Sequence, residues 1–243
     1  MKTILMTGAD TTIGEALIRR FVKDGSQVIA AGREVAPLIA ISQTLEGQML
    51  AVPVSSNDSK AVADYLAHLP ENWRQIDIMV NHAGLAFGHV PAWEADLAEW
   101  DEMIASNCTS LIHLTRTILP GLIARNAGFI INIGCVAGAY PHPGGHVFGA
   151  TQAFIRQFSR SLREDLLGKQ IRVTDIEPGY VEGSDFSTAR FPTKALEAGF
   201  TQLTPEHVAD AVCWVLSLPL PVNISHIEML PIFQGSTPLV VKR

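Results

Sequence analysis

Short apolar segments alternate with longer helical segments along the chain, and this alternation restricts the fold more than any other feature of the sequence. Several short segments are apolar throughout, which is typical of strands buried on both faces of a parallel sheet. The predicted strands are residues 3–6, 27–31, 49–54, 76–80, 128–133, 171–176 and 226–229. The predicted helices are residues 13–23, 35–45, 59–68, 97–124, 148–167 and 205–218. Alternating strands and helices favour an α/β fold, with a doubly wound parallel sheet of about seven strands and helices on both faces.

We expect one domain, residues 1–243, because no repeat, low-complexity tract or interdomain linker interrupts this rhythm. Residues 182–203 separate the sixth strand from the last helix and contain Pro192 and two glycines. A long connection of this kind is often functional, so we predict a substrate lid there. Residues 231–243 form the predicted C-terminal tail.

The charge and cysteine content exclude several classes of function. A formal net charge of −6 argues against nucleic acid or an anionic membrane as the main partner. No apolar run reaches the ~18 residues of a membrane span, and the first strand begins at once, without signal-peptide architecture. Three widely spaced cysteines do not suggest a disulfide framework. We therefore expect a cytoplasmic protein, whose apolar content of 47% favours subunit contacts.

The turn after the first strand is a candidate phosphate-binding site. Gly8 and Gly14 stand at its two ends, and a glycine turn that leads into a helix presents free N–H groups and the positive end of the helix dipole to an anion. The central glycine that lets backbone approach a pyrophosphate is replaced by Thr12. A structural interpretation, in which Thr12 lies near the helix cap, remains open.

Arg33 directly follows the second strand, where cofactor type is commonly determined. An acidic residue at this strand end binds a free ribose, whereas an arginine suits the 2′-phosphate. If a dinucleotide binds, Arg33 favours NADP(H). The alternative is a solvated arginine that opens a helix.

Short motifs recur in a fixed order behind the predicted strands. The turn Thr7-Gly8 is followed by Asn81-His82-Ala83-Gly84 after the fourth strand and by Pro178-Gly179 after the sixth. This order resembles the short-chain dehydrogenase/reductase family over the whole chain, which implies a single Rossmann-type domain. Within that family, residues 131–134, 156–159 and 173–179 are most similar to bacterial NADP-dependent 3-hydroxy acid dehydrogenases that act on serine or allo-threonine.

The resemblance implies a set of cofactor-binding positions and a homo-oligomer, either a dimer or a tetramer. The cofactor-binding positions are Gly8, Thr12, Ile13, Gly14, Arg33, Asn81, Ala83, Gly84, Pro178, Gly179 and Ser184.

The family's catalytic residues are replaced at three of four positions. A tyrosine that exchanges the proton, a lysine four residues later and a serine before them correspond here to Phe148, Gln152 and Cys135. Asn107 keeps the place of the family's asparagine. Phenylalanine cannot donate a proton and glutamine carries no charge. Losing a general acid typically lowers a rate by ~10²–10⁴.

These substitutions leave three hypotheses. The first is a degenerate family member that is inactive or very weak in hydride transfer and serves as a binding, regulatory or oligomer subunit, alone or mixed with an active relative. The second is an NADP-dependent oxidoreductase of a small 3-hydroxy acid or carbonyl that uses a substitute proton donor. The third is a cofactor-independent lyase or dehalogenase.

The sequence also contains candidate residues for a nucleophile pair, a phenol donor and a metal site. Cys135 with His142 or His146 would be a nucleophile pair, and Tyr140 would supply a phenol, but their spacing matches no known signature. His82, His142 and His146 lack the spacing of metal ligands, so we expect no metal site.

Overall fold

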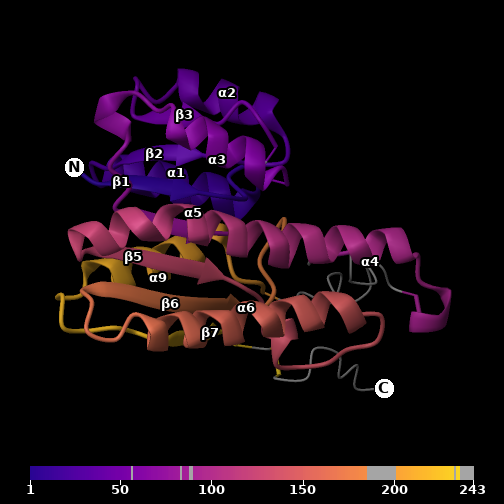
Figure 1. The fold of residues 1–243 in the computed structure, drawn as a ribbon. Helices are drawn as coiled ribbons and strands as arrows, with labels where there is room; N and C mark the ends of the chain where they lie inside the picture. Colours follow the sequence, from indigo (N-terminus) through magenta and orange to yellow (C-terminus); the bar gives the residue numbers. More distant parts are fainter. Residues whose placement is uncertain (56, 83, 88–89, 185–200, 233, 236–243) are drawn as a thin grey trace.

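Seven parallel strands form one sheet in the order β3-β2-β1-β4-β5-β6-β7 (Figure 1). This computed structural model describes the chain except residues 56, 83, 88–89, 185–200, 233 and 236–243. The strands are β1 (Thr3–Met6), β2 (Gln27–Ala30), β3 (Met49–Ala51), β4 (Ile78–Asn81), β5 (Gly128–Ile133), β6 (Ile171–Pro178) and β7 (His226–Met229). The predicted α/β fold with a doubly wound parallel sheet is confirmed.

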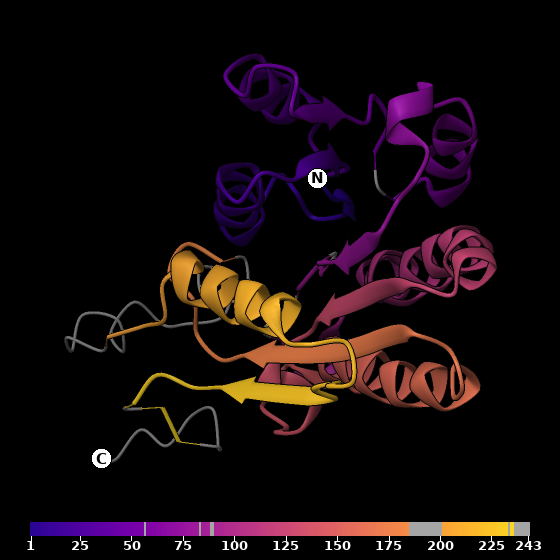
Figure 2. The ribbon, with the colours of Figure 1, turned by 90° about the vertical axis from the view of Figure 1, so that its left-hand side faces the viewer.

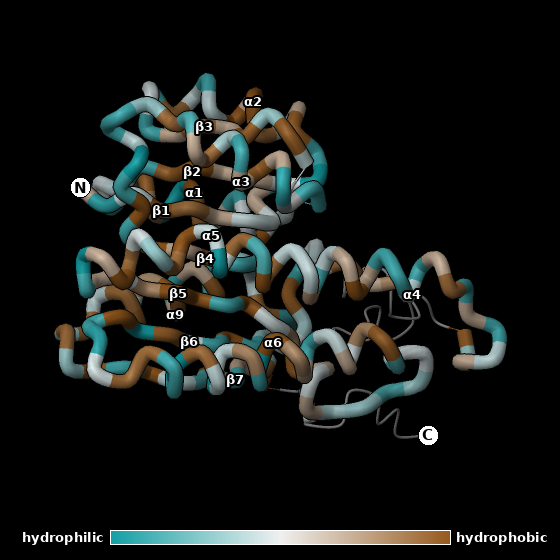
Figure 3. The backbone as a smooth tube through the Cα atoms, in the orientation of Figure 1, coloured by the Kyte–Doolittle hydropathy of each residue, from teal (hydrophilic) through white to brown (hydrophobic). Residues whose placement is uncertain are grey.

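Helices cover both faces of the sheet (Figure 2). They are α1 (Thr12–Lys23), α2 (Val35–Gln43), α3 (Ser59–Ala67), α4 (Leu97–Ile104), α5 (Ser110–Arg125), α6 (His146–Asp165) and α9 (Pro205–Ser217). One apolar core joins the sheet to α1, α2 and α9, and a second joins it to α3, α5 and α6. The brown colour of β1 and β2 in Figure 3 reflects this burial on both faces. None of the described helices is long and apolar enough to cross a membrane.

Several element boundaries differ from those predicted. The third strand ends at Ala51, because Pro53 has no N–H group to continue the ladder. The predicted helix 97–124 is divided by a π-helical turn, Ala105–Thr109, that joins α4 to α5. Helix α6 starts at His146 rather than residue 148. Much of the predicted lid and tail, residues 185–200, 233 and 236–243, lies outside the described part of the chain.

Buried amides connect the central strands to α6. The Nδ2 group of Asn81 at the end of β4 donates to Asn132 Oδ1 on β5 at 2.7 Å. Asn132 Nδ2 donates in turn to Ser159 Oγ on α6 at 2.7 Å. Hydrogen-bonded polar groups at this depth fix the helix against the sheet in one register.

An ionic cluster is buried between β6, β7 and α6. Arg156 on α6 forms a two-pronged ion pair with Glu177 on β6, and Glu177 is fully buried. His226 on β7 lies opposite Asp175 in the strand register, and its Nδ1 is 3.0 Å from Asp175 Oδ2. Burial, followed by the nearby Glu177 carboxylate, raises the pKa of Asp175 to about 8. Asp175 therefore holds a proton at neutral pH.

Replacing Asp175 by asparagine should stabilise the protein more at pH 8 than at pH 5. The unfolded chain releases the Asp175 proton near its ordinary pKa of 3.8, whereas the folded chain keeps it up to about pH 8. The free energy of unfolding from this group therefore falls as pH rises through that window. We expect the gain of Asp175→Asn to grow by at least about 1 kcal/mol between pH 5 and pH 8 in urea titrations. The exposed control Asp101→Asn should show no such growth, and an equal gain at both pH values for Asp175→Asn would contradict the assignment.

Candidate active site

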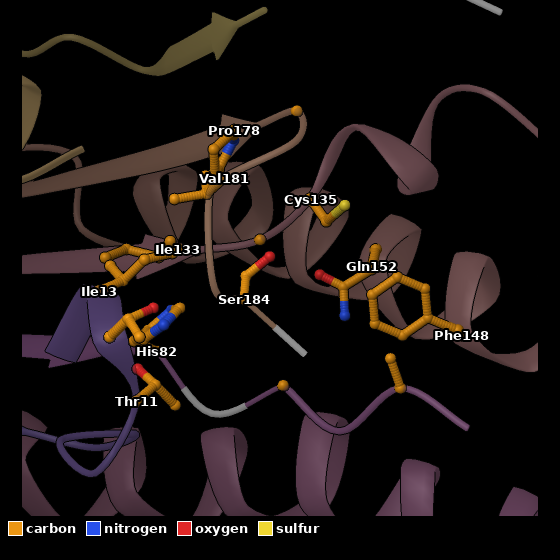
Figure 4. A pocket seen from close by; sticks show the side chains of 15 residues that line it. Thr11, Ile13, His82, Ile133, Cys135, Phe148, Gln152, Pro178, Val181 and Ser184 are labelled. Atoms are coloured by element: carbon orange, nitrogen blue, oxygen red, sulfur yellow. The ribbon is translucent and has the colours of Figure 1, made fainter. Parts of the chain in front are cut away.

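A pocket opens at the carboxyl ends of β1, β4, β5 and β6 (Figure 4). It contains about 600 Å³ of empty space, including its open mouth. Its lining residues come from five separate segments: Thr11, Thr12, Ile13, His82, Gly84, Ala86, Ile133, Gly134, Cys135, Phe148, Gln152, Pro178, Gly179, Val181 and Ser184. In open α/β sheets, ligands bind at this edge, where the strand order reverses between β1 and β4.

The first turn forms one end of the pocket. Gly8 has φ of +62°, and a Cβ there would lie 2.0 Å from the carbonyl oxygen of His82, so this position requires glycine. Thr11 caps α1 by accepting a hydrogen bond from Gly14 N at 3.0 Å. Thr12 and Ile13, the first residues of α1, line the pocket, and their amides have no acceptor inside the helix. This end suits the pyrophosphate of a dinucleotide.

Thr12 narrows the same end of the pocket. Its Cγ2 atom lies 3.1 Å from the position that a Cβ on Gly183 would take, so its methyl group lies against the segment after β6. A glycine in place of Thr12 would leave this contact empty. The threonine therefore constrains how far a pyrophosphate can enter between the two segments.

The loop after β4 contributes His82 and Gly84 to the pocket. Burial lowers the pKa of His82 to about 4, so its imidazole is neutral at physiological pH. Nothing in the described structure lies within 4 Å of a Cβ built on Gly84, which leaves that side open to a ligand. The Asn81 side chain points instead into the buried amide network, and Ala83 lies outside the described residues.

The three positions at which the sequence predicts replaced catalytic residues meet at the other end of the pocket. Cys135, Phe148 and Gln152 are all buried, and Figure 4 shows them facing one cavity. The Sγ of Cys135 accepts a hydrogen bond from Ala137 N at 3.5 Å. The structure thus brings together the positions that the sequence predicted, with a benzene ring and an amide in the places of a phenol and an ammonium group.

The remaining predicted positions are divided between the pocket and its surroundings. Pro178, Gly179 and Ser184 line the pocket on the β6 side. Arg33 is the third residue after β2 and is not among the residues that line the pocket. Asn107 is fully buried in the π-helical turn and supports the pocket from behind.

Asn107 holds the loop after β4 through both of its polar atoms. Its Oδ1 accepts from Leu85 N at 2.7 Å, and its Nδ2 donates to Leu85 O at 3.0 Å. Nδ2 is also 3.0 Å from Thr151 Oγ1 on α6. One side chain therefore positions the loop that carries His82 and Gly84 against the helix that carries Phe148 and Gln152.

The structure does not bring together the residues proposed for the alternative nucleophile and metal sites. Cys135 lines the main pocket, whereas His142 and His146 line a separate one beside the start of α6. Tyr140 donates its hydroxyl to the Glu228 carboxylate at 3.1 Å, and this bond raises its pKa. Among the described residues, the group whose geometry could hold a metal ion is Asp175, Glu177 and His226. The Arg156 guanidinium already pairs with Glu177 there, which opposes a second cation.

The sequence did not predict the ionic cluster, nor that a neutral His82 would line the pocket. The spacing of Asp175 and Glu177 by two residues places both on one face of β6, and Arg156 follows Gln152 by one helical turn. These spacings were readable, but the register that brings His226 beside Asp175 was not.

Comparison with known proteins gives a consistent family. The profile described as short chain dehydrogenase matches residues 2–195. The NADP-dependent 3-hydroxy acid dehydrogenase YdfG of Salmonella typhi is 46% identical, with 99% of each chain covered. The serine 3-dehydrogenase of Rhizobium radiobacter is 42% identical, with 96% of this chain and 95% of that protein covered. A solved closed form of serine dehydrogenase complexed with NADP+ superposes with a TM-score of 0.91 at 45% identity, covering 99% of each chain.

Replacing Asn107 by alanine should destabilise the fold. The change leaves the buried N–H and C=O groups of Leu85 without these partners, at about 1–3 kcal/mol for each unsatisfied group. We expect the free energy of unfolding in urea to fall by about 2–4 kcal/mol. The exposed control Asn57→Ala should change it by less than about 0.5 kcal/mol. Equal losses for the two variants would show that the Leu85 bridge contributes nothing.

Proposed function

Because the chain belongs to the short-chain dehydrogenase/reductase family, we propose that it binds NADP(H) and exchanges hydride with a small 3-hydroxy acid or the matching carbonyl compound. The proton of that reaction must come from a group other than residue 148. The observation that carries this proposal is one continuous pocket that runs from the amino end of α1 to Cys135, Phe148 and Gln152. Relatives that match nearly the whole chain include an NADP-dependent 3-hydroxy acid dehydrogenase and a serine 3-dehydrogenase.

The chain's own groups would bind and orient rather than transfer protons. The α1 amides and the helix dipole would hold the pyrophosphate, and Arg33 would meet the 2′-phosphate. Cys135 offers a weak S–H donor to the substrate oxygen, and Gln152 offers an uncharged amide to a ribose hydroxyl. The nicotinamide group, when bound, supplies or accepts the hydride.

The proton would then be exchanged with water that enters the open pocket. Phe148 has no exchangeable proton, and neutral His82 lies at the opposite end of the cavity in Figure 4. Losing a positioned general acid typically lowers a rate by ~10²–10⁴. Turnover is therefore expected to be slow while cofactor binding persists.

A second function is favoured by the same substitutions. With Phe148 and Gln152 both buried in the pocket, the site can serve as a cofactor-binding, non-catalytic module. Such a chain would act as a binding, regulatory or oligomer subunit. Binding of NADPH without any hydride transfer is its signature.

We further propose that the chain forms a homo-oligomer in the cytoplasm. Exposed large apolar side chains include Leu97 on α4 and Trp214 on α9, and each is available to a subunit contact. A mixed oligomer with an active relative is the alternative. The three cysteines of this chain are free, as in a reducing compartment. Light scattering of the purified chain gives its assembly state.

Calorimetric titration with NADPH, followed by assays on 3-hydroxy acids and short carbonyl compounds, separates the two functions. We expect NADPH to bind and turnover to be at least about 10²-fold below that of a tyrosine-containing relative measured alongside. Binding with no hydride transfer across the panel would support the non-catalytic module instead. A protein that folds but does not bind NADPH would refute both.

The double substitution Phe148→Tyr with Gln152→Lys should raise kcat by about 10² or more, because it returns a phenol and a neighbouring cation to one face of α6. NADPH affinity, measured separately, should change far less than kcat. The single substitution Phe148→Leu is the matched control and should not raise kcat. A folded, NADPH-binding double variant with unchanged turnover would show that the substrate end of the pocket no longer fits a 3-hydroxy acid.

A further inference from the structure

Asp10 brings a carboxylate from the first turn to the end of β2. Its Oδ2 accepts a hydrogen bond from Glu34 N at 2.9 Å. The rest of the carboxylate lies directly over Gly32, because a Cβ built there would be 2.5 Å from Asp10 Oδ1. Gly32 is the second residue after β2, so the acid occupies the carboxyl edge of that strand.

Within the described part of the chain, only one of the two Asp10 carboxylate oxygens has a hydrogen-bond partner. Asp10 Oδ1 is buried and receives no hydrogen bond there. No lysine or arginine of the described residues forms a salt bridge with Asp10. The neighbouring His82 is neutral, since burial lowers its pKa to about 4. Asp10 thus leaves a net negative charge at the end of β2.

A second acid adds to that charge. Glu34 follows Arg33, and its side chain is exposed at the start of α2. The end of β2 therefore carries one positive charge from Arg33 and two negative charges from Asp10 and Glu34. In dinucleotide-binding sheets this edge receives the adenosine ribose, where an acid favours a free 2′-hydroxyl and an arginine favours a 2′-phosphate.

We propose that Asp10 is a specificity-determining residue that opposes the 2′-phosphate, so that this chain does not prefer NADP(H) to NAD(H). The inference rests on the proposed dinucleotide binding. A phosphate brings ~1.5–2 negative charges at pH 7 into an edge that is already net negative. A ribose hydroxyl brings no charge to this edge. Asp10 acts from the turn after β1, and Arg33 remains at the end of β2.

Affinities of NADH and NADPH for the full chain, measured by calorimetry in the absence of substrate, test this inference. We expect the Kd for NADPH to be no more than about threefold below that for NADH in the native chain. Asp10→Asn keeps the side-chain shape and an oxygen for Glu34 N but removes the charge. It should tighten NADPH binding about tenfold or more and change NADH binding by less than about threefold.

Two further variants control for charge. Glu34→Gln should tighten NADPH binding less than Asp10→Asn, because an exposed charge is screened by solvent and salt. Asp101→Asn, which makes the same change in net charge at an exposed position on α4, should alter neither affinity.

If Asp10→Asn tightened the binding of both cofactors equally, or if the native chain strongly preferred NADPH, the role of Asp10 would be refuted. If neither cofactor bound the native chain or Asp10→Asn, the proposed dinucleotide binding itself would fail.

Discussion

The parallel pairing of β1 with β2 on one side and with β4 on the other determines where everything else in the site lies. The strand order reverses at this point, so the segments that follow β1 and β4 leave the sheet side by side. Gly8 permits that arrangement, since any side chain there would collide with the carbonyl oxygen of His82. The close approach places the start of α1 against the loop held by Asn107. The positions of both ends of the pocket depend on this contact.

The charge state of Asp175 is connected to the residue at position 152. Gln152 Oε1 and Asp175 Oδ1 lie 3.5 and 3.6 Å from the position that a Cβ on Gly134 would take, so both side chains border one small space. A cation at position 152 would stand beside a carboxylate and favour its ionised form. The neutral Gln152 gives no such support, and Asp175 holds a proton up to about pH 8. An amide beside a protonated acid leaves no unpaired charge in this space.

The sheet and the identity of the pocket residues were predictable because strands buried on both faces leave continuous apolar runs in the sequence. The glycine turn and the position of Cys135, Phe148 and Gln152 followed from their order relative to those strands. The π-helical turn was not predictable, since its residues have ordinary helical composition and the bulge depends on Asn107 reaching Leu85 across the loop. The cluster of Asp175, Arg156 and His226 depends on strand register and helix rotation together. A sequence pattern alone determines neither the strand register nor the helix rotation.

The two ends of the pocket have changed in different ways, and this separates binding from chemistry. At the end of the pocket lined by Phe148 and Gln152, neither side chain can supply the proton of a phenol or the charge of an ammonium group. At the phosphate end, the helix amides remain, but Thr12 lies against Gly183 and Asp10 adds charge. Contacts remote from the reacting atoms supply affinity, whereas groups at the reacting atoms supply rate. The fold itself requires glycine at position 8, whereas the amino end of α1 beside the cavity is the feature that an anionic ligand would use. A ligand with a pyrophosphate would therefore still meet the amides of α1 at one end of the pocket, whatever the rate of proton exchange at the other.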